Sequence, residues 1–199
     1  MPAQTLSTVP HLLTANSGPL LELERHILAH QDEIEIWLRQ QFHHSPAPFY
    51  TSVDLRNAGF KLAPVDTNLF PAGFNNLNPA SKPLCIQAIQ IALDRYCPEA
   101  KGILIIPENH TRNIFYLENI ATLHEYITLA GYRCAFGTLR EDVTNNTTID
   151  LPSGRTITLH TIARNSDNEI SIDDFTPCAV LLNNDLSAGR PPILEGISQ

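Results

Sequence analysis

The sequence predicts an α/β protein with a mainly parallel sheet. Residues 101–110, KGILIIPENH, hold a continuous apolar run of the kind found in strands that are buried on both faces. A helical pattern follows and ends at Gly131, and residues 132–139, YRCAFGTL, return to a strand pattern. Strand, helix and strand in this order are typical of a βαβ unit. With 199 residues, of which 43% are hydrophobic, the chain can bury a core of its own.

The N-terminal region predicts one long amphipathic helix after a flexible arm over residues 1–16. Residues 20–42 repeat leucine, isoleucine and phenylalanine at helical spacing. Ser17 and Gly18 can cap this helix, and Pro19 suits its first turn. Residues 49–56, FYTSVDLR, then predict a strand that leads into a polar segment.

Three further elements complete the expected domain, which spans residues 17–199. Residues 79–97 predict a helix that is apolar around much of its circumference and therefore buried, with two prolines in its opening turn. Residues 147–163 predict an appended hairpin around Pro152, Ser153 and Gly154. Residues 178–182 predict a buried strand that ends in Asn-Asn-Asp.

Composition and charge exclude several classes of function. The net charge is −8 and no run of lysine or arginine occurs, which disfavours nucleic-acid binding. The N-terminus lacks the pattern of a signal peptide, and no window is apolar for long enough to span a bilayer, so we expect a cytoplasmic protein without a membrane partner. The four cysteines form no CxxC pair, which predicts reduced, mostly buried thiols and no zinc site; these are Cys85, Cys97, Cys134 and Cys178.

Three polar clusters follow predicted strands, where ligands bind in open α/β sheets. They are residues 54–57 with their continuation to 76, residues 108–113, and residues 183–185. Arginine can hold a carboxylate by two parallel hydrogen bonds, and lysine can do so as a point charge, while asparagine and aspartate suit an amino group. The residues predicted to bind substrate are Arg56, Asn57, Lys61, Asp66, Asn68, Asn76, His110, Arg112, Asn183, Asn184 and Asp185.

A purely structural interpretation of the same residues stays open. Asparagine and aspartate also terminate strands and cap helices, and Asn113 or Thr111 can cap the helix that follows. His26 and His30 stand four residues apart, but a solvated helix face is favoured over a metal site, and we expect no metal ligands. His110 suits a general base or a hydrogen-bonding role equally. No GxSxG, Walker A or GxGxxG pattern occurs, so the catalytic residues stay unknown.

Four long segments carry a resemblance to a known family. VPHLLTANSGPLLELE, SVDLRNAGFKLAPVDTNLFPAGFNNL, IPENHTRNIFYLENI and LLNNDLSAGRPPILEGI run from about Val9 to Ile197. They resemble the N-terminal region of the proteobacterial glutamate–cysteine ligases. Members of this family join L-glutamate to L-cysteine with ATP and Mg²⁺, in the first step of glutathione synthesis.

The resemblance implies a Rossmann-like, three-layer domain of the type that precedes an ATP-grasp half. Family chains continue well beyond this length, and the half that clamps ATP and Mg²⁺ is expected outside these 199 residues. The chain alone is therefore expected to be inactive. From charge and position in the sequence alone, we expect Arg56 or Arg112 at a substrate carboxylate, Asp66 or Asp185 at an ammonium group, and Lys61 at a carboxylate or a phosphate. Four residues are expected to orient substrate by hydrogen bonds, namely Asn68, Asn76, Asn183 and Asn184.

Other functions remain open at this point. One alternative is a non-catalytic module that binds amino acids, and another is an interaction domain whose apolar edge packs on the remaining half. A ligase similar to glutathione synthetase is a third. The sequence also leaves a homo-oligomer open.

Overall fold

The computed structural model describes residues 17–58, 61–96, 102–109, 113–143, 146–187 and 189–199. The chain divides into two compact units, Met1–Pro71 and Ala72–Gln199, and each is described by itself. The expected single domain over residues 17–199 stays a prediction. No helix of the described residues has the length and the apolar character that crossing a bilayer requires.

Two helices form the start of the first unit, α1 (Gly18–Ala29) and α2 (Gln31–His44), so the prediction of one continuous helix over residues 20–42 is wrong. The chain leaves the helical conformation at His30, where φ is −111° and ψ is 18°. Nδ1 of the His30 ring lies 2.8 Å from the carbonyl oxygen of His26, and the His30 backbone N–H donates to Ile27 instead. In a continuous helix, the His26 carbonyl oxygen would accept the backbone N–H of His30. Here the imidazole of His30 takes the place of that N–H. Pro19 lies in the first turn as expected, whereas the Ser17 side chain makes no capping bond.

A two-stranded antiparallel sheet completes the first unit, with β1 (Ser52–Asn57) paired to β2 (Leu62–Asn68). The strand expected at residues 49–56 exists, but it belongs to this hairpin and not to a parallel sheet. The sequence does not show this pairing, because β2 contains a proline, Pro64, and its apolar and polar residues do not alternate, so it gives no strand signal.

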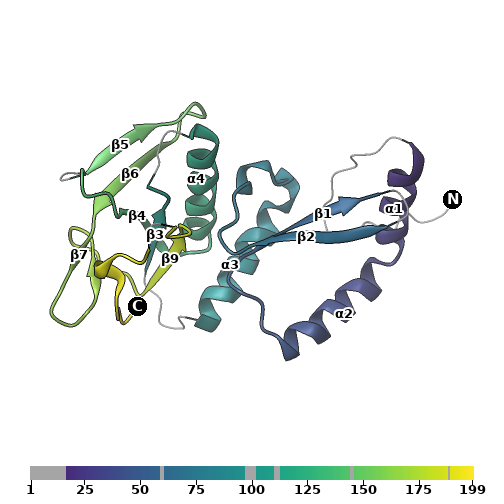
Figure 1. Cartoon of the computed structure of the whole chain (residues 1–199), viewed down its shortest axis with the longest axis horizontal. Helices are drawn as coiled ribbons and strands as arrows, with labels where there is room; N and C mark the ends of the chain where they lie inside the picture. The colour runs from purple at the N-terminus through teal and green to yellow at the C-terminus, as the bar shows by residue number, and fades with distance from the viewer. Residues whose placement is uncertain (1–16, 59–60, 97–101, 110–112, 144–145, 188) are drawn as a thin grey trace. The chain divides into compact units, whose positions relative to one another are not determined.

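The second unit contains a five-stranded sheet in the order β5-β6-β4-β3-β9 (Figure 1). Four of its strands are parallel, and the edge strand β5 is antiparallel to β6. The strands are β3 (Gly102–Pro107), β4 (Arg133–Thr138), β5 (Thr147–Asp150), β6 (Thr156–Thr161) and β9 (Ala179–Asn183). The mainly parallel sheet predicted from the βαβ pattern is confirmed.

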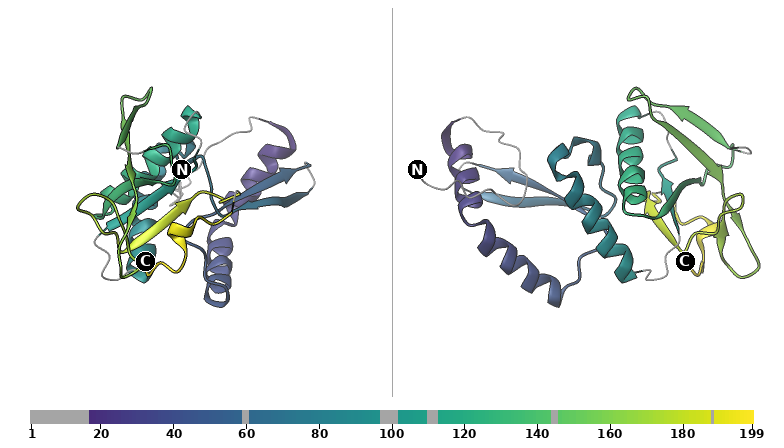
Figure 2. Two further views of the ribbon diagram at one scale, coloured as in Figure 1. Left: turned by 60° about the vertical axis from the view of Figure 1, so that its left-hand side comes forward. Right: turned by 180° about the vertical axis from the view of Figure 1, so that it is seen from behind.

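The predicted hairpin at residues 147–163 exists but is not an appendage. Its second strand, β6, pairs in parallel with β4, so the hairpin extends the central sheet (Figure 2). A separate small ribbon of β7 (Ala163–Arg164) and β8 (Ile170–Ser171) follows it. The apolar side of β6 explains its place, because Ile157 and Leu159 are fully buried and must face a core.

The helix between β3 and β4 is α4 (Ile114–Leu129), and it packs on β4 and β6. Its N-cap is Asn113, whose side chain accepts the backbone N–H of Tyr116 at 3.2 Å, so one of the two predicted caps is confirmed. Gly131 lies at a φ of +98°, the left-handed conformation that commonly ends a helix and that glycine adopts without strain.

Helix α3 (Lys82–Tyr96) follows a 3-10 turn, η2 (Pro79–Ser81), and packs on α4. The prediction of a largely buried helix is wrong. Ile89 and Leu93 are buried, whereas Leu84 is 40% exposed and Ile91 is 56% exposed. Only the face of α3 that packs on α4 is buried. Apolar residues around much of the circumference of a helix therefore did not indicate that the whole helix is buried.

The core lies on both faces of β3, whose six residues are all buried. Leu104 and Ile106 pack against a cluster from later in the chain, which includes Ile170, Phe175 and Leu194. These covering residues come from the small ribbon, irregular segments and the 3-10 turn η3 (Pro192–Leu194), not from a helix. The expected three-layer arrangement is therefore not confirmed.

Three of the cysteines lie in described residues and form no disulfide, as expected for reduced thiols. They are half-buried, where the sequence predicts mostly buried thiols; they are Cys85, Cys134 and Cys178. Cys97 lies outside the described residues.

Candidate substrate-binding site

Two neighbouring parallel strands, β3 and β9, end side by side in the second unit. Their last registered pair is Pro107 with Asn183. After β3 the chain adds β4 and then β6 on one side of β3, and it later adds β9 on the other side. The direction in which strands are added therefore reverses between β3 and β9. Ligands of open α/β sheets bind outside the carboxyl ends of strands at such a reversal. The residue 183–185 cluster and the described residues Glu108 and Asn109 of the second cluster lie at this edge.

The two asparagines of the cluster at the end of β9 are buried, and the cluster is bonded to the end of β3. Asn183 is 1% exposed and Asn184 is 3% exposed. The Asn184 side chain donates to the carbonyl oxygen of Pro107 at 3.0 Å, and its own oxygen accepts the Leu186 backbone N–H at 2.9 Å. The backbone N–H of Asp185 donates to Glu108 Oε1 at 3.0 Å. The two asparagines thus hold the strand ends together, which is the structural role that the sequence left open.

Tyr116 joins the two strand ends from the first turn of α4. Its hydroxyl accepts the backbone N–H of Glu108 at 2.9 Å. The same hydroxyl lies 2.8 Å from the Asn183 backbone oxygen and 2.9 Å from the Asn183 side-chain oxygen, and it can donate its one hydrogen to either. Sequence reasoning missed Tyr116. Its place three residues after the helix cap was the available signal.

The chain beyond Asp185 adopts a strained conformation. Leu186 has a φ of +52°, and its side chain packs against the core cluster around Leu104. A left-handed conformation costs a residue with a Cβ about 1–3 kcal/mol, and such strain is concentrated at functional sites. The Asp185 carboxylate, which also accepts the Ser187 backbone N–H at 2.9 Å, is positioned by this turn.

A second polar turn is held by the same face of α4. The oxygen of the Asn119 side chain accepts the backbone N–H groups of Gly73 and Phe74, at 2.7 and 2.8 Å. These residues open the 3-10 turn η1 (Phe74–Asn76), in which the Asn76 backbone N–H donates to the Gly73 oxygen at 2.9 Å. Tyr116 and Asn119 are three residues apart on one helix, so one face of α4 holds both the residue 183–185 cluster and the turn with Asn76.

The remaining predicted site residues lie elsewhere. His110 and Arg112 are outside the described residues. Five belong to the hairpin of the first unit and not to a parallel strand end, which corrects the expectation for that cluster; they are Arg56, Asn57, Lys61, Asp66 and Asn68. The error arose because a strand followed by polar residues looks the same in a hairpin as in a βαβ unit.

The hairpin nevertheless gathers polar groups on one face. Asp54 stands directly opposite Asp66, and Ser52 stands opposite Asn68. Since side chains alternate between the faces of a strand, Arg56 shares the face of Asp54. Lys61 closes the turn, because its backbone oxygen accepts the Ala58 N–H at 3.0 Å. The hairpin thus carries charges of both signs, which can pair with the two charges of a zwitterion.

Two cavities accompany the sheet of the second unit. One, of about 520 Å³, lies at the carboxyl ends of β4 and β6, between Thr138, Thr161 and residues 191–193. Arg140 at its rim is held by Asp142 through two hydrogen bonds, of 3.0 and 2.6 Å. The cavity therefore offers hydroxyl groups and a guanidinium that is already paired with a carboxylate.

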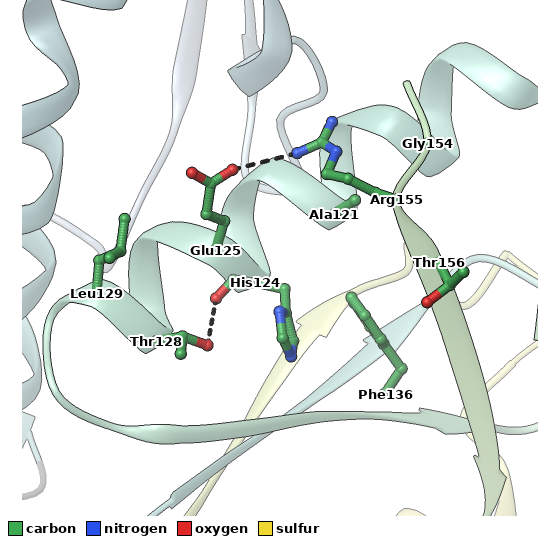
Figure 3. A pocket seen from close by; sticks show the side chains of 9 residues that line it. All are labelled: Ala121, His124, Glu125, Thr128, Leu129, Phe136, Gly154, Arg155 and Thr156. Atoms are coloured by element: carbon green, nitrogen blue, oxygen red, sulfur yellow. Dashed lines mark hydrogen bonds and ion pairs between the residues drawn. The ribbon is translucent and has the colours of Figure 1, made fainter. Parts of the chain in front are cut away.

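The other cavity, of about 480 Å³, lies between α4 and the start of β6 (Figure 3). His124 stacks on Phe136 in its wall, with ring centres 5.0 Å apart. Burial lowers the pKa of His124, which the hydrogen bond to the Cys134 carbonyl oxygen and the nearby Glu125 charge only partly oppose. Arg155 crosses the rim, with its guanidinium 3.4 Å from Glu125 and 2.5 Å from Glu118. These paired charges bind the hairpin to α4.

The described residues do not provide a resident metal site. Among them, no three histidine, cysteine or carboxylate side chains are grouped so that they could hold one ion. His26 and His30 lie near each other, with ring centres 4.4 Å apart, but a ring nitrogen of His30 is used by the His26 backbone.

The chain is thus a mixed α/β protein with a mainly parallel sheet. The carboxyl ends of its parallel strands form a polar edge with buried amides and an exposed carboxylate. Comparison with known proteins gives the family. The chain belongs to the glutamate-cysteine ligase family, whose model matches residues 24–199. The resemblance seen in the sequence is thereby confirmed.

A solved structure agrees with this assignment. The chain is similar to a protein of Methylobacillus flagellatus KT that is assigned as a gamma-glutamylcysteine synthetase, with 52% identity and a TM-score of 0.82. The match covers 96% of this chain but 45% of that one, so the chain spans less than half the length of this relative. A comparison with curated proteins gave no match.

Proposed function

We propose that the chain is the N-terminal part of an ATP-dependent ligase that joins L-glutamate to L-cysteine, as in glutathione synthesis, and that this part holds an amino-acid substrate. The family match over residues 24–199 carries the proposal. The similarity to the assigned gamma-glutamylcysteine synthetase supports it. The strand order supports a Rossmann-like fold. The four parallel strands lie in the order β6-β4-β3-β9, which is 3-2-1-4 when they are numbered along the chain.

The proposed chemistry defines what these residues contribute. Formation of the γ-glutamyl amide requires activation of the glutamate γ-carboxylate and attack by the cysteine amino group. Arg56 would pair with a substrate carboxylate by two parallel hydrogen bonds. Asp66 or Asp185 would hold an ammonium group, and Asn76 would orient a carboxylate or carbonyl through its exposed amide. Each role is one of binding and orientation, which speeds a reaction by fixing its geometry.

The described residues do not fit ATP and Mg²⁺ as resident groups. They include neither a glycine-rich phosphate loop nor three grouped metal ligands. We therefore assign no residue of the described chain to either group. The nucleotide and its metal belong, in this proposal, to the additional length of the longer relative.

An assay of ADP formation tests the ligase proposal. The Methylobacillus relative, incubated with Mg²⁺-ATP, should release ADP only when both L-glutamate and L-cysteine are present, and the 199-residue chain alone should release none. Failure of the relative to release ADP with both amino acids would contradict the proposed reaction. ADP release by the 199-residue chain would contradict the assignment of the nucleotide to the additional length.

A second candidate function for the first unit is interaction with another protein surface, and one observation favours it. Among its described residues, no large apolar side chain is buried, whereas Trp37 is 58% exposed and Leu55 is 58% exposed. Val53, Leu55 and Leu62 share the face of the hairpin that is opposite Arg56. Exposed apolar surface of this kind marks sites of protein interaction.

A further inference from the structure

We infer that Asn119 is a positioning residue, which holds the Gly73–Asn76 turn in the conformation that presents Asn76 to an amino-acid substrate. The inference rests on the proposed function. It adds a residue of α4 that no sequence motif indicates and that lies beneath the site instead of in it.

The first argument is the geometry of the amide. One oxygen of Asn119 accepts two consecutive backbone N–H groups, those of Gly73 and Phe74, at 2.7 and 2.8 Å. The residues are 46 and 45 positions apart along the chain, so the bonds fix a tertiary contact and not a local turn. The contact holds the start of η1, and Asn76 lies two residues further on.

The second argument is the cost of keeping an asparagine at this position. Asn119 is 1% exposed in α4, near the fully buried Leu117 and Ile120. Its Nδ2 group has no acceptor among the described residues. A buried donor without a partner destabilises the fold, so an asparagine is kept at this position at a cost. The two bonds to the turn account for the asparagine.

The third argument is the turn itself. Gly73 has a φ of +114°, a conformation that strains any residue with a Cβ. A Cβ at Gly73 would meet only the Asn76 side chain, at 3.8 Å, so its substitution would strain the backbone without a clash. The turn is thus defined from two sides, by the amide of Asn119 and by the glycine.

Hydrogen exchange and ligand titration on the 199-residue chain test the inference together. In Asn119→Ala, the amides of Gly73 and Phe74 should exchange at least about tenfold faster, because they lose their acceptor. The dissociation constant of L-glutamate should rise about tenfold or more, because Asn76 is no longer held. Asn119→Asp keeps both acceptor bonds and should restore slow exchange and much of the affinity.

Thr122→Ala is the matched control. Thr122 is also a buried polar residue of α4, but its hydroxyl bonds to Glu118 and Arg155 and not to the turn. This variant should leave the exchange of Gly73 and Phe74 and the affinity for L-glutamate unchanged. If Asn119→Ala does not fold, Gly73→Ala disturbs the same turn from the surface and should weaken binding to a similar extent.

The outcomes separate this inference from the function on which it rests. If the wild-type chain binds L-glutamate and both Asn119→Ala and Gly73→Ala bind it equally well, the positioning role is wrong and the proposed function stands. Fast exchange at Gly73 and Phe74 in the wild-type chain would overturn the positioning role directly. If the wild-type chain binds neither L-glutamate nor L-cysteine, the proposed substrate site and the inference both fail.

Discussion

At the scale of single residues, the structure divides the polar side chains at the carboxyl edge between two roles. Asn183 and Asn184 are almost completely buried and hold strand ends together, and Tyr116 bridges the same ends. Asp185 and Asn76 are exposed, and both are among the residues proposed to bind a substrate. The residues that build the edge are thus distinct from those proposed to bind.

Arg56 provides the first residue-level test. Arg56→Ala should weaken binding of an amino-acid substrate by about 1–3 kcal/mol, the range for a lost hydrogen bond between charged groups. Titration calorimetry with L-glutamate measures this change. Arg39→Ala is the control, because Arg39 is a highly exposed arginine of the same unit that pairs only weakly with Glu35. Equal affinities of wild type and Arg56→Ala would remove Arg56 from the site.

His124 predicts a pH dependence of stability. Burial lowers its pKa in the folded chain, so the unfolded chain takes up a proton first as the pH falls. The stability contributed by neutral His124 is therefore complete above its unfolded pKa of about 6.5 and is lost as the pH decreases below that value. Urea unfolding at pH 7.5 and pH 5.5 should show a larger loss of unfolding free energy for wild type than for His124→Gln. The same loss in both proteins would rule out His124 as its source.

The scale of elements shows which parts of the fold a sequence can predict. The strand at 102–107 and the helix that follows were predictable, because a fully apolar run and a capped helical pattern each determine local structure. The break at His30 and the pairing of β1 with β2 were not. The first depends on one side-chain bond, and the second depends on a strand partner that has little apolar alternation.

The same limit applies to the candidate site. The sequence located Asn183, Asn184 and Asp185 at a strand end, because polar residues directly after an apolar run give a clear signal. It could not find Asn119, whose partners lie 45 and 46 residues away along the chain, and it missed Tyr116, whose partner Asn183 lies 67 residues away. It also placed Arg56 at a parallel edge, because a local pattern cannot identify the sheet to which a strand belongs.

The bridge between α4 and the strand ends is testable as an element. Tyr116→Phe removes the acceptor of the Glu108 N–H and the donor to Asn183, and it should lower the free energy of unfolding by about 1–3 kcal/mol. Tyr132→Phe is the matched control, because the Tyr132 hydroxyl donates to Asp94 at an exposed position and its loss should cost less. Chemical denaturation of both variants gives the comparison. An equal cost in the two would contradict the prediction, because the bridge would then add no more stability than an exposed hydrogen bond.

For the whole molecule, the two units differ in how they bury apolar side chains. The second unit has a continuous core around β3, whereas the described residues of the first unit bury no large apolar side chain. The chain also covers 45% of the length of its solved relative. The exposed apolar side chains support the interaction role proposed for the first unit.

Exposed apolar surface predicts self-association of the 199-residue chain. Val53 and Leu55 are 47% and 58% exposed on one hairpin face, and apolar faces of this kind associate in water. Sedimentation velocity should show oligomers that decrease in the double variant Val53→Thr with Leu55→Thr. Leu129→Gln is the control for an exposed leucine of the other unit. A monomeric wild-type chain at high concentration would contradict this role for the hairpin face.

The most direct test of the central claim is a calorimetric titration of L-glutamate into the 199-residue chain, repeated with L-cysteine and with Mg²⁺-ATP. We predict saturable binding of at least one amino acid and no binding of the nucleotide. An absence of binding for both amino acids would contradict the claim that this part of the ligase carries a substrate site.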